Sequence, residues 1–320
     1  MLPPYFSAIS VENRLADHLL IMVYALNLIK SSNIGQMFIS VDAETHLSID
    51  FFIRQMKQAR FNMAQGNNVQ TPTDDAKAAI VTSPSKVHSL LAGCDVVLFD
   101  CDGVLVDSEP ISLATLTDVL AHFGAPLSLR DVSDRFTGRS SAAPIDYIQS
   151  QTGKDMTDAF KPYFYEKLFV RYDHDLVSIA GIEDVLAALK LRGTAFCISS
   201  SSSVERLEKT MQVTGLGAWF TGHIYSADFV RNGKPAPDLF LHAASEMGYR
   251  PKQAIVIEDS VAGVTAAVAA GMKCIGFVGG GHYADNRDVA CQRLYDAGAD
   301  IVLNDMAILA KAMQPNRNRL

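Results

Sequence analysis

The strongest constraint on the fold is a series of short apolar segments that alternate with helical patterns from about residue 93 onward. These segments are rich in Val, Ile and Phe, and several are apolar at successive positions rather than at every second one. Strands of this kind are buried on both faces, as in a parallel sheet that helices cover on each side. The pattern predicts a doubly wound, Rossmann-like α/β fold. The expected strands lie at residues 95–100, 194–199, 223–226, 254–258, 273–277 and 300–303.

One segment interrupts this alternation. Between Asp107 and about Ile179 the sequence has helical periodicity but no convincing strand. An insertion directly after the first strand lies at the carboxyl end of the sheet, where ligands bind in such folds, so we interpret it as a helical cap. The start of the chain has helical patterning without a chemical motif, and a polar, turn-rich stretch follows it. The expected divisions are an N-terminal extension at 1–60, a linker at 61–92, a catalytic core at 93–112 and 179–312, and the cap at 113–178.

Composition argues against several classes of protein. The net charge of −7 disfavours nucleic-acid binding, which depends on basic residues. The longest apolar run, at 19–29, is far shorter than the ~20 residues of a membrane-spanning helix, and it lacks the basic start of a signal peptide. Five scattered cysteines without a CxxC pair indicate reduced thiols, and eight histidines without a close pair give little support for zinc. We therefore expect a cytoplasmic protein that binds neither nucleic acid nor a membrane.

The most informative motif is the run from Asp100 to Ser108, DCDGVLVDS, at the end of the first expected strand. Asp100 and Asp102 are separated by one residue, and their charges repel unless a cation or a shared proton compensates for them. Gly103 permits an abrupt turn directly after the strand. The run therefore predicts a charged site at this strand end.

Polar residues also follow the other strands. A run of serines, 199–203, comes after the second strand at a helix start, where hydroxyls and backbone N–H groups bind phosphate well. Within it, Ser202 and Glu205 have the spacing of a capping box. Lys234 precedes a later helix, and the fourth strand ends at Glu258 and Asp259, an oxygen-rich pair that suits Mg²⁺. Alone, each has an ordinary explanation as a helix cap, an exposed lysine or a solvated acidic turn. The carboxyl ends of parallel strands meet, so together they predict one site.

This ordered set resembles the haloacid dehalogenase superfamily over roughly residues 94–310. The helical insertion is similar to the type 1 cap of the branch that contains phosphoglycolate phosphatase and β-phosphoglucomutase. Within that branch the chain looks most like bacterial sugar-phosphate phosphatases, of which the 6-phosphogluconate phosphatase type is one. The resemblance implies a Mg²⁺-dependent phosphatase that acts on a small phosphorylated metabolite through an aspartyl-phosphate.

The resemblance also implies roles for individual residues. Asp100 is the expected nucleophile and Asp102 the expected general acid/base, which we expect its carboxylate neighbours to help keep protonated. The expected phosphate-binding residues are Ser200, with Ser199 as the alternative, and Lys234. The expected magnesium ligands are Asp100, the backbone carbonyl of Asp102, and Asp259 with support from Glu258.

The predictions about the cap and about alternative activities rest on single residues. Arg139, in the loop 136–140, could bind a second anionic group of the substrate, although an exposed arginine explains it equally well. A phosphomutase of the β-phosphoglucomutase type would have a histidine where Ser112 stands. A dehalogenase would lack the second aspartate, so Asp102 argues against it. A non-catalytic phosphate-binding protein would be expected to have lost one of the charged motif residues, and none is missing.

Overall fold

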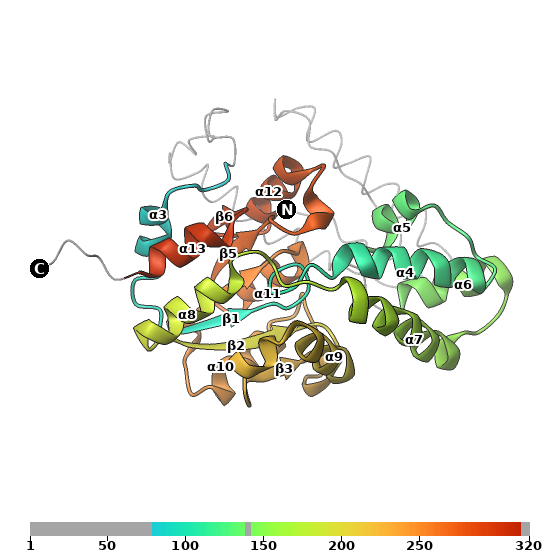
Figure 1. Ribbon diagram of the computed structural model, residues 1–320, viewed down its shortest axis with the longest axis horizontal. Coiled ribbons are helices and arrows are strands. Elements are labelled where there is room, and N and C mark those ends of the chain that lie inside the picture. Colours follow the sequence, from blue (N-terminus) through green and yellow to red (C-terminus); the bar gives the residue numbers. More distant parts are fainter. Residues whose placement is uncertain (1–78, 138–141, 315–320) are drawn as a thin grey trace, which may run out of the picture. The chain divides into compact units, whose positions relative to one another are not determined.

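The computed structural model describes residues 79–137 and 142–314. Within them a six-stranded, fully parallel sheet forms the centre of the fold (Figure 1). Its strands are β1 (Val96–Phe99), β2 (Ala195–Ser200), β3 (Ile224–Ser226), β4 (Ala254–Glu258), β5 (Lys273–Phe277) and β6 (Ile301–Leu303). These strands confirm the expected ones, each to within one residue at either end. The spatial order is β3-β2-β1-β4-β5-β6, so the succession of strands reverses between β1 and β4. Doubly wound sheets bind their ligands at this kind of reversal.

Helices lie between the strands, as the sequence predicted, and also before the first strand and after the last. They are α3 (Pro84–Leu90), α4 (Glu109–His122), α5 (Leu129–Phe136), α6 (Ala143–Thr152), α7 (Thr157–Asp175), α8 (Ile182–Arg192), α9 (Val204–Thr214), α10 (Asp238–Glu246), α11 (Val261–Ala269), α12 (Arg287–Asp296) and α13 (Met306–Met313), of which α3 precedes β1 and α13 follows β6. Short 3-10 helices are η2 (Leu216–Trp219), η3 (Ala227–Phe229), η4 (Pro251–Gln253) and η5 (Gly281–Tyr283). None of the helices in the described residues is both long enough and apolar enough to cross a membrane.

The two faces of the sheet bury separate sets of side chains. Val97 and Phe99 of β1 lie in the cluster formed with α3, α8, α9 and α13. Val96 and Leu98 lie in the opposite cluster, formed with α10, α11 and α12. Burial on both faces is what apolar residues at successive positions predict.

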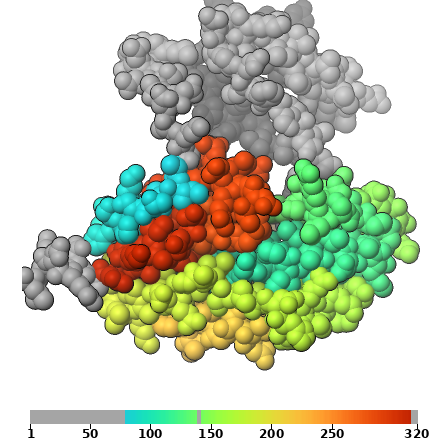
Figure 2. Space-filling model, turned by 45° about the horizontal axis from the view of Figure 1, so that its top comes forward, coloured from blue at the N-terminus to red at the C-terminus, as the bar shows by residue number. Residues whose placement is uncertain are grey.

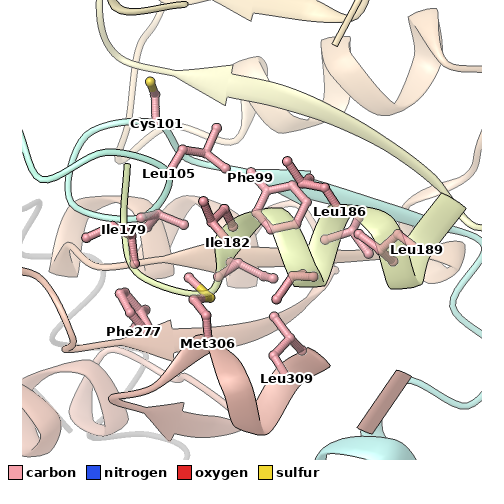
Figure 3. Packing of buried hydrophobic residues seen from close by; sticks show 14 of the residues in the cluster. Phe99, Cys101, Leu105, Ile179, Ile182, Leu186, Leu189, Phe277, Met306 and Leu309 are labelled. Carbon is pink, nitrogen blue, oxygen red and sulfur yellow. The ribbon is translucent and has the colours of Figure 1, made fainter. Parts of the chain in front are cut away.

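Figure 3 shows the first of these clusters, in which side chains of the sheet pack against α8 and α13. Burying a side chain of this size contributes ~1.5–3 kcal/mol, so this packing fixes the strands and therefore the positions of their carboxyl ends. The side chains in contact include Phe99, Ile182, Leu186, Phe277, Met306 and Leu309.

The helical insertion between β1 and β2 is confirmed as α4–α7, drawn in green in Figure 1. It has a small apolar core of its own, in which Leu120 and Ile148 are fully buried. The two segments that join it to the sheet are hydrogen-bonded to each other, since the backbone N–H of Asp107 donates to the carbonyl of Val177 at 3.0 Å. This pairing holds the base of the cap beside the end of β1.

Residues 84–90 form α3, inside the segment that we expected to be a linker. Val87 and Leu91 are buried in the cluster that includes α13, and Figure 2 shows the cyan surface of α3 against the red surface of α13. Upstream, the backbone N–H of Val81 donates to the carbonyl of Val302 in β6 at 2.8 Å. The few apolar residues here are spaced among polar and turn-forming ones, so the pattern resembled a linker although the segment packs on the core.

Candidate active site

Three carboxylate side chains meet where β1 and β4 end. Asp100 follows β1, Glu258 is the last residue of β4, and Asp259 comes directly after it. One ligand oxygen from each residue lies within 4.8 Å of the other two. All three residues are buried, with exposed fractions of 6%, 1% and 5% in that order. The structure therefore brings together three acidic residues that the sequence placed at different strand ends. We call Asp100, Glu258 and Asp259 the acidic cluster.

Lys234 is the cation that faces this cluster. Its Nζ donates to Oδ1 of Asp100 and to Oε1 of Glu258, both at 2.7 Å, and its side chain is only 3% exposed. The other oxygen of Glu258 accepts from the backbone N–H and the hydroxyl of Ser260 at 2.7 and 2.9 Å. Both Glu258 oxygens are therefore already bonded, whereas Asp259 leaves more of its carboxylate available.

The acidic cluster carries more negative charge than Lys234 can balance. Burial raises the pKa of Asp100 well above its usual range; Lys234 opposes this shift, and Glu258 and Asp259 add to it. Burial and Glu258 likewise raise the pKa of Asp259. Three carboxylates against one ammonium form an oxygen-only donor set with surplus negative charge, which fits a hard dication such as Mg²⁺.

Glycines allow this close packing. Gly103 has a φ of 77°, and a Cβ atom there would lie 1.9 Å from Oδ2 of Asp259. Gly281 donates its backbone N–H to Oδ1 of Asp107 at 2.9 Å, and a Cβ atom there would lie 2.7 Å from the other oxygen of that carboxylate. A side chain at either position would therefore push the loop after β1 or the loop after β5 away from the site.

Asp102 lies in a different environment. Its Oδ2 accepts from the hydroxyl of Ser202 at 2.5 Å, and its Oδ1 accepts from Nη2 of Arg206 at 2.7 Å and from the hydroxyl of Ser108. Burial would raise the pKa of Asp102, but the charge of Arg206 and these hydrogen bonds outweigh it, so the pKa is lowered. Our expectation that neighbouring carboxylates would help keep Asp102 protonated was wrong, because its nearest charged partner is a cation. Arg206 was missed, since an arginine in the first turn of a helix has no motif of its own.

A histidine that we did not predict contacts the acidic cluster. Nε2 of His282 lies 3.2 Å from Oδ2 of Asp259, and the ring is only 5% exposed. Burial lowers the pKa of His282 and so favours the neutral form of the ring, whereas the charges of Glu109 and Asp107 oppose this shift. The sequence did contain a signal, because three glycines directly precede His282 and such a run permits unusually close backbone approach.

The serines of the run 199–203 differ in their hydrogen-bond partners. The hydroxyl of Ser200 accepts from the backbone N–H of Ser202 at 3.2 Å, whereas the buried hydroxyl of Ser199 has no hydrogen-bond partner within the described residues. The capping box expected at Ser202 was wrong by one residue. Ser203 is the N-cap of α9 and accepts from the backbone N–H of Arg206, while Ser202 bonds to Asp102. Arg139, the expected cap contact, lies outside the described residues.

Comparisons with known proteins agree with this geometry. Residues 97–277 match the family model described as haloacid dehalogenase-like hydrolase. The chain is 29% identical over 189 residues to the 6-phosphogluconate phosphatase of Escherichia coli (strain K12), an alignment that covers 59% of this chain and 84% of that protein. It is 32% identical over 227 residues to the chloroplastic protein SUPPRESSOR OF QUENCHING 1 of Arabidopsis thaliana, covering 69% of this chain but only 21% of that protein. The chain thus spans about a fifth of the Arabidopsis protein.

A solved structure extends the similarity to three dimensions. A HAD family hydrolase from Deinococcus radiodurans R1, solved with bound phosphate and sodium, is 35% identical. The match covers 70% of this chain and 99% of that one, with a TM-score of 0.56.

Proposed function

The chain belongs to the haloacid dehalogenase-like hydrolases, and from this premise we propose that it is a Mg²⁺-dependent phosphatase that acts on a small phosphorylated metabolite through an aspartyl-phosphate on Asp100. The observation that carries the proposal is the placement of the two aspartates. Asp100 faces Lys234 and the acidic cluster, whereas Asp102 is held by a separate set of donors. This separation supports a two-step hydrolysis in which one carboxylate attacks phosphorus and the other transfers protons.

In the first step, an oxygen of Asp100 attacks phosphorus and the bond from phosphorus to the substrate's alcohol oxygen breaks. This step requires the protonated form of Asp102, which gives its proton to that oxygen. In the second step, Asp102 takes a proton from a water molecule, which attacks phosphorus and releases inorganic phosphate and free Asp100. Arg206, Ser108 and Ser202 lower the pKa of Asp102 and so favour its carboxylate form, which is the form needed to deprotonate water.

Charge cancellation supports the same reaction. Lys234 and Ser200 are proposed to bind the phosphoryl oxygens; Ser200 is the last residue of β2, and the N-cap of α9 follows at Ser203. We propose that the side chains of Asp100 and Asp259 and the carbonyl of Asp102 hold the Mg²⁺, with Glu258 as support. When bound, the metal supplies positive charge against the transferring phosphoryl group.

The substrate class rests on the relatives. The Escherichia coli relative is a 6-phosphogluconate phosphatase, and the Deinococcus relative bound phosphate. We propose a sugar phosphate or a phosphosugar acid, with Arg139 of the cap as the residue that binds a second anionic group. The alternative of a phosphomutase gains nothing from the geometry, because the hydroxyl of Ser112 is bonded to Arg206 at 3.0 Å. A cytoplasmic location stays our proposal, supported by the buried free thiols of Cys101, Cys197 and Cys274.

The test is release of inorganic phosphate from a panel of sugar phosphates, phosphosugar acids and phosphoglycolate. We expect turnover with Mg²⁺, loss of turnover in excess EDTA, and recovery when Mg²⁺ is added back. Conversion of a sugar 1-phosphate to its 6-phosphate without phosphate release would support the mutase instead. No phosphate release from any ester, or full activity in EDTA, would refute the proposal.

A further inference from the structure

We propose that Arg206 is a positioning residue for Asp102: its guanidinium holds this carboxylate in the orientation from which it exchanges a proton with the leaving alcohol and with water. The inference rests on the proposed function, because it assigns a role within that reaction. It adds a residue of α9 to the proposed site residues, most of which lie at or after the ends of strands.

Arg206 belongs to α9 and contacts two further helices, α4 and α7. It lies in the first turn of α9, and α9 packs against the cap helix α7 (Figure 1). Its Nη2 donates to Oδ1 of Asp102 at 2.7 Å and to the hydroxyl of Ser112 at 3.0 Å. Its guanidinium carbon lies 5.8 Å from the centre of the Tyr172 ring, within the range of a cation–π contact. Ser112 belongs to α4 and Tyr172 to α7, the first and last cap helices. The guanidinium is therefore fixed from both ends of the insertion.

The remaining donors to Asp102 are less rigid. Ser108 and Ser202 each offer one hydroxyl, whose hydrogen rotates freely about its own bond. A planar guanidinium presents its donors in a fixed fork, and here the plane is restrained by the contacts with Ser112 and Tyr172. Of the groups that touch Asp102, Arg206 is thus the one that sets the direction of the carboxylate.

Stability alone does not explain this ion pair. The side chains of Arg206 and Asp102 are only 14% and 15% exposed, and Nε of Arg206 has no hydrogen-bond partner within the described residues. Two desolvated charges and an unpartnered buried N–H group are costly, and apolar residues of similar volume often replace such pairs without loss of stability. A role in orienting Asp102 accounts for a feature that packing would not favour.

An ion pair between α9 and α7 provides a matched control. Lys209 of α9 donates to Asp173 of α7 at 2.6 Å, and the two side chains are 20% and 52% exposed. Replacing Lys209 removes a cation and a contact between α9 and α7 without touching Asp102. Comparing Arg206→Met with Lys209→Met therefore separates the effect on Asp102 from the effect on the joint between cap and core.

The experiment is a double-mutant cycle with two classes of ester. A sugar phosphate that the wild-type protein hydrolyses needs its leaving group protonated, whereas p-nitrophenyl phosphate barely does. We expect Arg206→Met to lower kcat for the sugar phosphate by ~10–100-fold, the value of a charged hydrogen bond, with little change in KM. Phosphoenzyme formation from p-nitrophenyl phosphate, measured as a burst, should be nearly unchanged. In an Asp102→Asn background, Arg206→Met should change kcat for the sugar phosphate by less than ~2-fold. Lys209→Met should behave as wild type.

Other outcomes overturn the assignment. If Arg206→Met lowered both reactions equally, and by the same factor in the Asp102→Asn background, Arg206 would be structural only. If Arg206→Met does not fold, Arg206→Lys gives the same test, since it keeps the charge but loses the planar fork, and we expect an intermediate loss confined to the sugar phosphate. A wild-type protein that releases no phosphate would overturn the proposed function and this role with it. An active wild type with an additive cycle would overturn this role alone.

Discussion

Two sides of one small site show opposite ways of holding an aspartate. On the acidic side, Asp100 lies among Glu258 and Asp259, with Lys234 as the facing cation. On the other side, which we call the Arg206 side, Asp102 is surrounded by donors from Ser108, Ser202 and Arg206. One residue, Cys101, separates the two aspartates, yet the pKa of Asp100 is raised and that of Asp102 is lowered.

The two sides differ in whether residues of the chain balance their charge. The acidic side has surplus negative charge, so it should respond strongly to a dication. The Arg206 side has its charge balanced by a residue of the chain itself, so it should respond to changes of geometry and little to metal. If the two sides are separate, replacing a residue of one side should change that side and leave the other unchanged.

The largest effect is expected for Asp100→Asn. An amide oxygen at this position cannot form the aspartyl-phosphate, so turnover should fall by ~10⁴-fold or more. Mass spectrometry of enzyme quenched in acid should find a phosphorylated peptide in the wild type and none in the variant. A phosphorylated Asp102 would show that we had exchanged the roles of the two aspartates.

The next largest effect is expected for Asp102→Asn, which leaves the nucleophile in place but removes the proton donor and the later base. Turnover of a sugar phosphate should fall by ~10²–10⁴-fold. With p-nitrophenyl phosphate the variant should give a burst of p-nitrophenol approaching one equivalent, followed by a slow steady state. A variant that lost the burst as well would show that Asp102 takes part in formation of the phosphoenzyme even with an activated ester.

A smaller effect on the acidic side is expected for His282→Ala, measured as the Mg²⁺ concentration that gives half of the maximal rise in melting temperature. His282 touches Asp259, and loss of a residue that orients a metal ligand typically weakens binding ~10–100-fold. His282→Gln keeps a donor and should be intermediate. His242→Ala provides the control, because that ring packs in T-shaped contacts with Tyr225 and Phe229 instead.

The same measurement tests whether the two sides are independent. Arg206→Met should leave the Mg²⁺ requirement unchanged, since Arg206 bonds to Asp102 and Ser112 rather than to the acidic cluster. An equal shift in both variants would show that the two sides act as one unit.

The sequence predicted the acidic side better than the Arg206 side, for a physical reason. Asp100, Glu258 and Asp259 stand at the ends of apolar strands, and parallel strands bring their carboxyl ends together whatever the details of packing. Local sequence therefore determined both where these residues lie and that they meet.

Arg206 and His282 depend on tertiary contacts that no local pattern encodes. Arg206 lies in the first turn of α9, whose N-cap is Ser203, one residue later than the capping-box spacing at Ser202 suggested. His282 reaches Asp259 because the preceding glycines let the loop after β5 approach. The helix α3 was missed for the same reason, since Val87 is buried by its contact with a helix more than two hundred residues away.

The smallest effects are expected within the serine run, where the Arg206 side meets the end of β2. Ser202→Ala removes one hydrogen bond to Asp102 but leaves Arg206 and Ser108 in place, so turnover of a sugar phosphate should fall by ~10-fold or less. Ser199→Ala removes a buried hydroxyl that has no partner within the described residues. Removing such a group should leave turnover unchanged and stabilise the fold by ~1 kcal/mol, measured by urea unfolding.

Ser200→Ala completes this comparison, because we assign phosphate binding to Ser200. It should raise KM and lower kcat, with a larger loss than either neighbouring variant. The three variants differ only in which hydroxyl is lost from one stretch of chain, so their order of activity reports directly on which hydroxyl binds the phosphoryl group. If Ser199→Ala were the inactive variant and Ser200→Ala the neutral one, the phosphate-binding serine would be Ser199. The hydroxyl of Ser199, which has no partner within the described residues, would then be the group that binds the phosphoryl oxygen.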